Sequence, residues 1–195
     1  MADNLQDFYG GLLDDVVLLN RALSAEEIQS DQVADAEAFE GPETIVVEAE
    51  DYATIDSVWR VRKDSDASGG VYLTTGNHAG NYYDQPPADD CALTYDFEVT
   101  QGGEYQILAS VQGLTGNDNS FWVKVDDGDW ILWDVAVTGD NWQWDTVTDR
   151  DGGDQRILFD LAAGSHTLRI AMREDGTRLD QIVITNDLSL DPTTL

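Results

Sequence analysis

FWVKVDDGDWILWDVAVTGDNWQWDTV, residues 121–147, contains five of the six tryptophans of the chain. Aromatic side chains bury the largest areas, so a hydrophobic core needs some of these indoles. One pair of strands cannot hide all five, and we therefore expect some of them to be exposed. Trp122 alternates with Phe121 on a predicted strand and is expected in the core, whereas Trp130 and Trp133 are left open. An exposed indole in so acidic a chain indicates a surface that contacts a ligand.

Short apolar runs extend on both sides of this stretch, from Thr44 onward. They recur at intervals of roughly 10–15 residues and are separated by clusters of Gly, Asp and Asn. Apolar residues alternate along residues 95–99 and 168–172, and no amphipathic helix lies between the runs. This pattern predicts an all-β fold over residues 44–188, a two-sheet antiparallel β-sandwich of the jelly-roll type.

The two ends of the chain differ from this pattern. Residues 8–30 predict a short strand and helix, with Ser24 and Glu27 spaced as a capping box. Residues 31–43 are an acidic linker, and residues 189–195 resemble the start of another. No apolar run approaches the ~18 residues of a membrane span, and the N-terminus lacks the basic start of a signal peptide. We expect a piece of a longer chain, in which this absence says little about export.

Charge is the strongest feature of the composition. Thirty-nine acidic residues stand against ten basic ones, and the acids are spread along the whole chain. Such a chain has no cluster of bases for nucleic-acid phosphates or for anionic membranes. A solvated anionic surface is typical of proteins that work in high salt, and indicates a halophilic or marine source; a nucleic-acid mimic is the alternative. The single Cys91 excludes an internal disulfide framework and a multi-cysteine zinc site.

Two sets of motifs resemble known families. The first set resembles the closing strand and helix of laminin-G-like, concanavalin-type lectin domains, and makes residues 1–30 the tail of such a domain; it consists of Gly10-Gly11, Asp14-Asp15-Val16, Asn20–Ser24 and Glu26–Ile28. The second set resembles carbohydrate-binding modules of families 6 and 35; it consists of Glu48–Tyr52, Ala67–Gly70, Tyr95–Phe97, Gly103-x-Tyr105, Asn119–Val123 before Asp126, Trp142-x-Trp144, Ala163–Leu168 and Leu179-Asp180-x-Ile182. The Trp142-x-Trp144 motif differs from the pattern of these modules, which often carry W-x-x-W.

The second resemblance carries the functional expectations. It implies a calcium-containing β-sandwich that binds a polysaccharide or oligosaccharide without catalysis. It further implies a secreted or cell-surface protein, with a catalytic module on the same parent chain that the sandwich brings to its substrate.

A calcium site is predicted where Glu48 and Glu50 stand two residues apart on a strand. Both side chains then point to one face, ~7 Å apart, and repel each other unless a cation or solvent separates them. An exposed acidic face of an edge strand is the alternative. The resemblance implies that Asp180 and loop carbonyls near residues 66–68 complete the shell of a structural Ca²⁺, which prefers oxygen ligands.

The resemblance implies a sugar site in the loops at one end of the sandwich. A pyranose ring has an apolar face of C–H groups edged by hydroxyls, which calls for a flat aromatic ring and polar side chains. The resemblance implies Tyr72 and Trp142 as the aromatic residues. Tyr72 can equally be a core tyrosine, whereas Trp142 follows turn-forming residues and is expected to stack on the sugar. Trp144, two residues on, is expected in the core.

Polar groups for the same site are expected from Arg178, Asn119 and Asn141. Arg178 stands where the resembled modules usually carry an asparagine, and its fork suits vicinal hydroxyls, a carboxylate or a sulfate. It therefore favours an acidic or sulfated polysaccharide, and a salt bridge to Glu174 or Asp175 is the alternative. Asn119 can equally belong to a turn.

Catalysis is not expected. Paired carboxylates are the one catalytic option, and 39 acidic residues make such a pair inevitable and therefore uninformative. No HExxH, GxSxG or phosphate-loop motif occurs. A structural or adhesive domain of a cell-surface protein is the second hypothesis, and a glycoside hydrolase or polysaccharide lyase is the third. Binding to glycans, or release of new sugar ends, separates the three.

Overall fold

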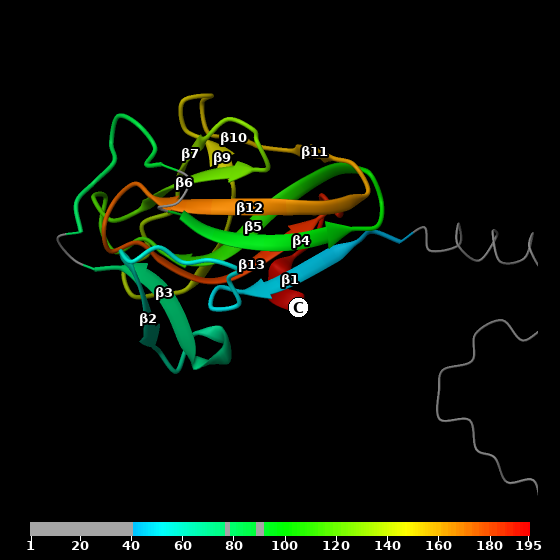
Figure 1. Ribbon diagram of the computed structural model, residues 1–195. Coiled ribbons are helices and arrows are strands. Elements are labelled where there is room, and N and C mark those ends of the chain that lie inside the picture. Colours follow the sequence, from blue (N-terminus) through cyan, green and yellow to red (C-terminus); the bar gives the residue numbers. More distant parts are fainter. Residues whose placement is uncertain (1–40, 77–78, 89–91) are drawn as a thin grey trace, which may run out of the picture. The chain divides into compact units, whose positions relative to one another are not determined.

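The computed structural model describes residues 41–76, 79–88 and 92–195 (Figure 1). Two antiparallel sheets pack together, which confirms the predicted all-β sandwich. The strand and helix expected in residues 8–30 lie outside the described residues, as do Cys91 and most of the linker at 31–43. No helix in the described ranges is long and apolar enough to cross a membrane.

The larger sheet has seven strands. Its path runs β11-β5-β13-β3-β2, with β1 added to β13 and β8 added to β5. β1 pairs with β13 from Thr44↔Thr185 to Glu48↔Gln181, so the first and last strands of the sandwich lie side by side. The strands are β1 (Thr44–Glu48), β2 (Trp59–Lys63), β3 (Val71–Thr75), β5 (Gly103–Gln112), β8 (Gln143–Thr146), β11 (Phe159–Leu161) and β13 (Arg178–Thr185).

The second sheet has four strands in the order β4-β12-β6-β7 (Figure 1). They are β4 (Ala92–Val99), β12 (Gly164–Met172), β6 (Ser120–Val125) and β7 (Ile131–Asp134). A small hairpin, β9 (Thr148–Asp149) with β10 (Gln155–Arg156), and two short 3₁₀ turns, η1 (Ser68–Gly70) and η3 (Pro192–Thr194), complete the described elements.

The core lies between the two sheets and follows the alternation of the sequence. Every second residue of β4 points inward, namely Leu93, Tyr95, Phe97 and Val99, and so do Leu168, Ile170 and Met172 of β12. Ile107, Ala109 and Val111 of β5 meet them from the other sheet. Burial of apolar area contributes roughly 25 cal/mol per Å², so this face-to-face contact is the main source of stability.

The tryptophans are more buried than the sequence suggests. Trp133 is fully buried in the core, and Trp59, the one tryptophan outside residues 121–147, lies in β2 and stacks on Phe121 with ring centroids 6.2 Å apart. Trp122 is buried as expected, although in a small cluster outside the main core with Ala92, Leu132 and Ala171. The other three, Trp130, Trp142 and Trp144, are half-buried.

The expectation that Trp144 is the core residue of its motif is wrong. Trp144 pairs with Ser110 across β8 and β5. Ala109 and Val111, on either side of Ser110, belong to the core, so Ser110 and Trp144 point to the outer face of the larger sheet.

A hydrogen-bonded pair, His166 and Asp126, links two turns of the sandwich. The Nδ1 of His166 lies 2.7 Å from Asp126 Oδ2, and its Nε2 lies 2.7 Å from the carbonyl oxygen of Ala162. Both partners are acceptors, so the imidazolium form, which donates from both nitrogens, suits the site best. The hydrogen bonds to Ala162 and Asp126 raise the pKa of His166. Burial opposes the shift at Asp126, but hydrogen bonds from His166 and Thr167 lower its pKa.

We expect the stabilising effect of His166 to depend on pH. The raised pKa means that its contribution is complete below the unfolded value of about 6.5 and is lost as pH rises through the folded value. The contribution of Asp126 is lost as pH falls through its lowered pKa, below about 3.9. The difference in melting temperature between the wild type and His166→Gln should therefore be largest near pH 5 and should shrink as pH rises through the raised pKa of His166. A pH-independent difference would contradict this.

Candidate functional site

A pocket of about 370 Å³ opens where strands β2, β3 and β13 of the larger sheet lie side by side. Its lining includes Arg62, Tyr72, Thr74, Leu114 and Arg178. Two of these, Tyr72 and Arg178, were predicted as ligand-binding residues, and the structure brings them together.

Strand register explains why these side chains share a face. Arg62 stands opposite Tyr72 across β2 and β3, and Arg178 stands opposite Thr74 across β3 and β13. Directly paired residues of antiparallel strands point to the same side of the sheet. Thr74 is two residues from Tyr72, so all four side chains point to one face.

Tyr72 is both a buried strand residue and a wall of the pocket. Only 9% of the residue is exposed. The guanidinium of Arg178 lies 5.2 Å from its ring centroid, within the range of a cation–π contact. The ring of Trp142 approaches from another side in an edge-to-face arrangement, with centroids 5.5 Å apart. Tyr72 is buried outside the main core between the sheets, and its role in ligand binding stays a prediction.

Arg178 is held by neutral groups and by one exposed acid. Its Nη1 donates to Gln112 Oε1 at 2.6 Å and lies 3.3 Å from Asp140 Oδ1. The expected alternative, a salt bridge to Glu174 or Asp175, is wrong. Glu174 instead pairs with Arg173 at 2.9 Å in a buried contact.

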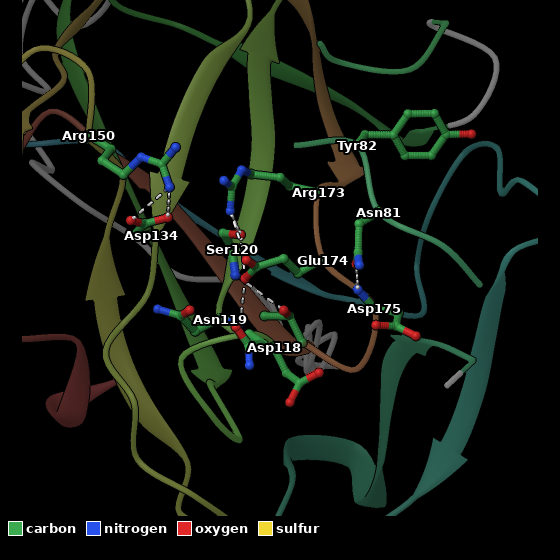
Figure 2. Close-up of polar contacts among 12 residues, drawn as sticks. Asn81, Tyr82, Asp118, Asn119, Ser120, Asp134, Arg150, Arg173, Glu174 and Asp175 are labelled. Carbon is green, nitrogen blue, oxygen red and sulfur yellow. Dashed lines mark hydrogen bonds and ion pairs between the residues drawn. The ribbon is translucent and has the colours of Figure 1, made fainter. Parts of the chain in front are cut away.

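This buried ion pair forms a separate network beside the pocket (Figure 2). Arg173 and Glu174 both contact Ser120, at 2.8 and 2.7 Å, and the amide of Asn119 donates to Glu174. The network fixes the turn between β12 and β13, which continues into Gly176 of the pocket wall. Breaking one partner of a buried pair is costly, because the other charge is left without compensation.

The remaining predicted sugar-binding residues lie outside the pocket lining. Trp142 is half-buried, and its Nε1 donates to Asp64 Oδ2 at 3.2 Å. Asn141 is exposed, and its Nδ2 donates to the carbonyl of Thr138 at 2.9 Å within one turn. Asn119 donates its Nδ2 to the carbonyl of Val135 at 2.8 Å, so it fastens two loops together, beside the network of Figure 2. Trp142 is nevertheless adjacent to the pocket, because its ring packs against Tyr72, which lines the pocket.

Arg62 is the pocket residue that sequence reasoning missed. It belongs to β2, a strand of sequence WRVRK that carries three of the ten basic residues of the chain. The concentration of bases in so acidic a chain was a usable signal. Strand alternation would have placed Arg60 and Arg62 on one face.

The predicted calcium ligands lie where β1, β13 and the turn η1 meet. Three buried carboxylate oxygens have no hydrogen-bond partner among the described residues: Glu48 Oε2, Glu50 Oε2 and Asp180 Oδ1. Two of the other oxygens accept hydrogen bonds. Glu48 Oε1 accepts from Ser68 and Gln181, at 2.7 and 2.8 Å, and Asp180 Oδ2 accepts from Ser110 at 2.9 Å.

The electrostatics of this cluster favour a cation. Burial raises the pKa of Asp180 to about 6, and the charges of Glu48 and Glu50 add to the shift. Burial also raises the pKa of Glu50, with a further contribution from Glu48. Buried carboxylate oxygens without partners are a hard-oxygen set of the kind that Ca²⁺ prefers. Across the ranges that the structure describes, no three acidic, His or Cys side chains are already spaced as metal ligands, so the carboxylates would have to move closer together.

Gly69 in the turn η1 packs closely against this cluster, where a side chain would crowd Glu50. Its φ of +61° is in the left-handed region, which side chains with a Cβ rarely adopt. A Cβ at this position would lie 2.9 Å from Glu50 Oε1. Glycine therefore lets the turn close over the carboxylates.

Comparison with known proteins identifies the family. Residues 39–194 match the model of the glycosyl hydrolase family 115 C-terminal domain. The chain belongs to this family. No curated protein sequence matches the chain.

Solved structures share the fold of this glycosyl hydrolase family 115 C-terminal domain. A family 35 carbohydrate-binding module from Clostridium thermocellum is 21% identical, with a TM-score of 0.53 over 72% of this chain and 97% of that one. The C-terminal family 6 module of a marine laminarinase from Zobellia galactanivorans is 20% identical, with a TM-score of 0.50 over 74% of this chain and 100% of that one. A β-(1,4)-mannanase with a family 35 module, from Podospora anserina, is 18% identical, with a TM-score of 0.53; the match covers 76% of this chain and 29% of the mannanase. The predicted resemblance to families 6 and 35 is thus confirmed at the level of the fold.

Proposed function

We propose that this domain binds an anionic glycan in the pocket formed by β2, β3 and β13, and that it does so without catalysis. The proposal rests on the pocket lining. A tyrosine stands between two arginines, in a chain that has only ten basic residues against 39 acidic ones. Its membership of a glycosyl hydrolase C-terminal family and its fold support a role in carbohydrate recognition.

Charge distribution favours a carboxylate or sulfate on the sugar. The three bases of β2 are exposed, and Arg62 and Arg178 face the same pocket. A protein of net charge −29 repels anions over most of its surface, so a local group of arginines raises the concentration of an anionic ligand there. Arginine also presents a planar fork that matches a carboxylate or sulfate in a bidentate manner.

The pocket geometry suggests how such a sugar is held. Tyr72 lines the pocket and would offer its ring to the C–H face of a pyranose, and Trp142 packs against Tyr72 in a T-shaped pair. Arg178 is immobilised against Tyr72 and Gln112, so little side-chain freedom is lost when it binds a ligand. Trp142, beside the pocket, would be a second aromatic surface for stacking on the sugar.

The same proposal gives the domain its biological setting. A glycan-binding domain of a glycosyl hydrolase family would bring a catalytic module of the same parent chain to its polysaccharide. Such substrates lie outside the cell, so we infer a secreted or cell-surface protein. The acidic surface suits a marine or high-salt environment.

We also propose that Glu48, Glu50 and Asp180 bind a structural Ca²⁺. The three buried carboxylate oxygens without partners support this assignment. The ion would neutralise the carboxylates and link β1, η1 and β13. It would stabilise the scaffold and take no part in glycan contact.

A glycan array with calcium present tests the proposed function. The full chain is expected to bind glycans that carry carboxylate or sulfate groups, and to bind their neutral counterparts at least tenfold more weakly. The signal should decrease as salt increases, because salt screens the arginine contacts. Binding to no glycan would support the adhesive alternative, and release of reducing ends or unsaturated sugars would support an enzyme.

Trp142→Ala belongs in the same array. This variant should lose most of the glycan signal while its melting temperature stays close to that of the wild type, because Trp142 is outside the main core. Unchanged binding would remove Trp142 from the site and leave Tyr72 as its aromatic surface.

A further inference from the structure

Asp140 is the acidic residue that meets Arg178 at the pocket. The two side chains approach to 3.3 Å, and within the described ranges Asp140 is the one carboxylate found in contact with this guanidinium. The Arg178 side chain is 22% exposed, whereas the Asp140 side chain is 87% exposed. The acid therefore reaches the arginine from the solvent side, the side from which a ligand would also arrive.

The backbone of Asp140 is held by hydrogen bonds, whereas its exposed side chain contacts Arg178. Gln112, which accepts from Arg178, donates its Nε2 to the carbonyl of Asp140 at 2.9 Å. The amides of Thr138 and Gly139 both donate to the carbonyl of Gly113, at 3.0 and 3.1 Å. The loop thus holds Asp140 beside Arg178, while the carboxylate can swing away without disturbing any of these bonds.

Arg178 itself does not depend on Asp140 for its position. Its Nη1 donates to Gln112 at 2.6 Å, which is closer than the contact with Asp140, and its guanidinium lies on the Tyr72 ring. An exposed ion pair contributes little free energy. Asp140 therefore forms only a weak ion pair with the Arg178 guanidinium, whose position is already fixed by Gln112 and Tyr72.

We propose that Asp140 is an internal competitor for the ligand's anionic group on Arg178, and that it sets the affinity and charge selectivity of the pocket. In the free protein its carboxylate takes the place that a sugar carboxylate or sulfate takes in the complex. An anionic ligand displaces it, whereas a neutral sugar leaves it in contact with Arg178. This inference rests on the proposed binding of anionic glycans at this pocket.

The test compares Asp140→Asn with the wild type by NMR titration, using the full chain. The probes are D-glucuronate, D-glucose 6-sulfate and D-glucose, which differ in the charged group at C6. Asp140→Asn is expected to bind the two anionic sugars about two- to fivefold more tightly, from the weakness of an exposed ion pair, and to bind D-glucose unchanged. A gain of the same size for D-glucose would overturn the proposal.

Two further variants separate competition from a general change of charge. Asp118→Asn removes the same charge beside Gly176 of the pocket wall, and it should give less than half of the gain. In an Arg178→Gln background, Asp140→Asn should give no gain, because the guanidinium for which it competes is absent. An equal gain from Asp118→Asn, or a gain that persists without Arg178, would overturn the proposal.

Failure of the proposed function has a different signature. If neither the wild type nor Asp140→Asn binds any of the three sugars or any charged glycan of the array, the pocket is not a glycan site and the inference falls with it. If the wild type binds the anionic sugars and Asp140→Asn binds them no better, the competitor role alone is refuted.

Discussion

Arg178→Gln is expected to weaken binding of a carboxylated or sulfated glycan by about ten- to a hundredfold. A hydrogen bond to a charged group contributes about 1.5–3 kcal/mol, and an arginine fork can make two such bonds with one anion. The melting temperature should fall modestly, because the buried Gln112 loses the hydrogen bond that Arg178 donates, whereas the loss of the exposed ion pair with Asp140 contributes little. Isothermal titration with the tightest array ligand measures the affinity, and thermal unfolding measures the stability.

Arg156→Gln is the matched control for this prediction. Arg156 is an exposed base of β10, and its contact is the carbonyl of Leu188 at 3.1 Å, so it is not part of the pocket lining. Its loss changes the net charge by the same amount and should alter affinity less than threefold. Equal losses from both variants would mean that Arg178 acts through net charge alone, and unchanged affinity in Arg178→Gln would exclude it from the site.

Local patterns in the sequence predicted the fold because they are properties of neighbouring residues. Alternation along Tyr95, Phe97 and Val99 reports which side of β4 is apolar, and it needs no knowledge of the partner strand. The same reasoning failed at Trp144. Alternation says that residues 142 and 144 share a face, but only the pairing of Trp144 with Ser110 shows which face that is.

The pocket was predictable only in part, since long-range register builds it. Tyr72 and Arg178 were found through a family resemblance. Arg62 enters through its pairing with Tyr72, and Asp140 reaches Arg178 from a loop 38 residues away in sequence. Neither the pairing of Arg62 with Tyr72 nor the contact of Asp140 with Arg178 can be predicted from a local sequence pattern.

The calcium site, unlike the pocket, was predicted largely from local sequence. The spacing of Glu48 and Glu50 on one strand was enough to predict repulsion between two carboxylates on one face. The structure adds that an oxygen of each is buried without a partner, as is one of Asp180. The sequence could not show burial, which raises the free-energy cost of these charges and supports the proposed Ca²⁺.

Removing calcium with EGTA is expected to lower the melting temperature by about 10 °C. A ligand at a hundred to a thousand times its dissociation constant stabilises the folded state by about 3–4 kcal/mol, and each kcal/mol shifts the melting temperature of a domain this size by about 2–4 °C. Excess Ca²⁺ should restore the original value. Mg²⁺ should not, since it demands a near-ideal octahedral shell. A melting temperature that EGTA does not move would refute the calcium assignment.

Glu50→Gln distinguishes loss of calcium binding from general damage to the fold, because its effect on the melting temperature should differ without and with calcium. Without calcium, the charge of Glu50 raises the pKa of Asp180, and burial of Glu50 already penalises its charged form. A neutral amide removes this repulsion, so the variant should melt at the same temperature as the calcium-free wild type or higher. With calcium it should melt lower than the wild type, because one ligand of the ion is missing. Glu104→Gln, an exposed change on β5, should leave the response to calcium intact. A Glu50→Gln variant that keeps the full calcium response would show that the ion binds elsewhere.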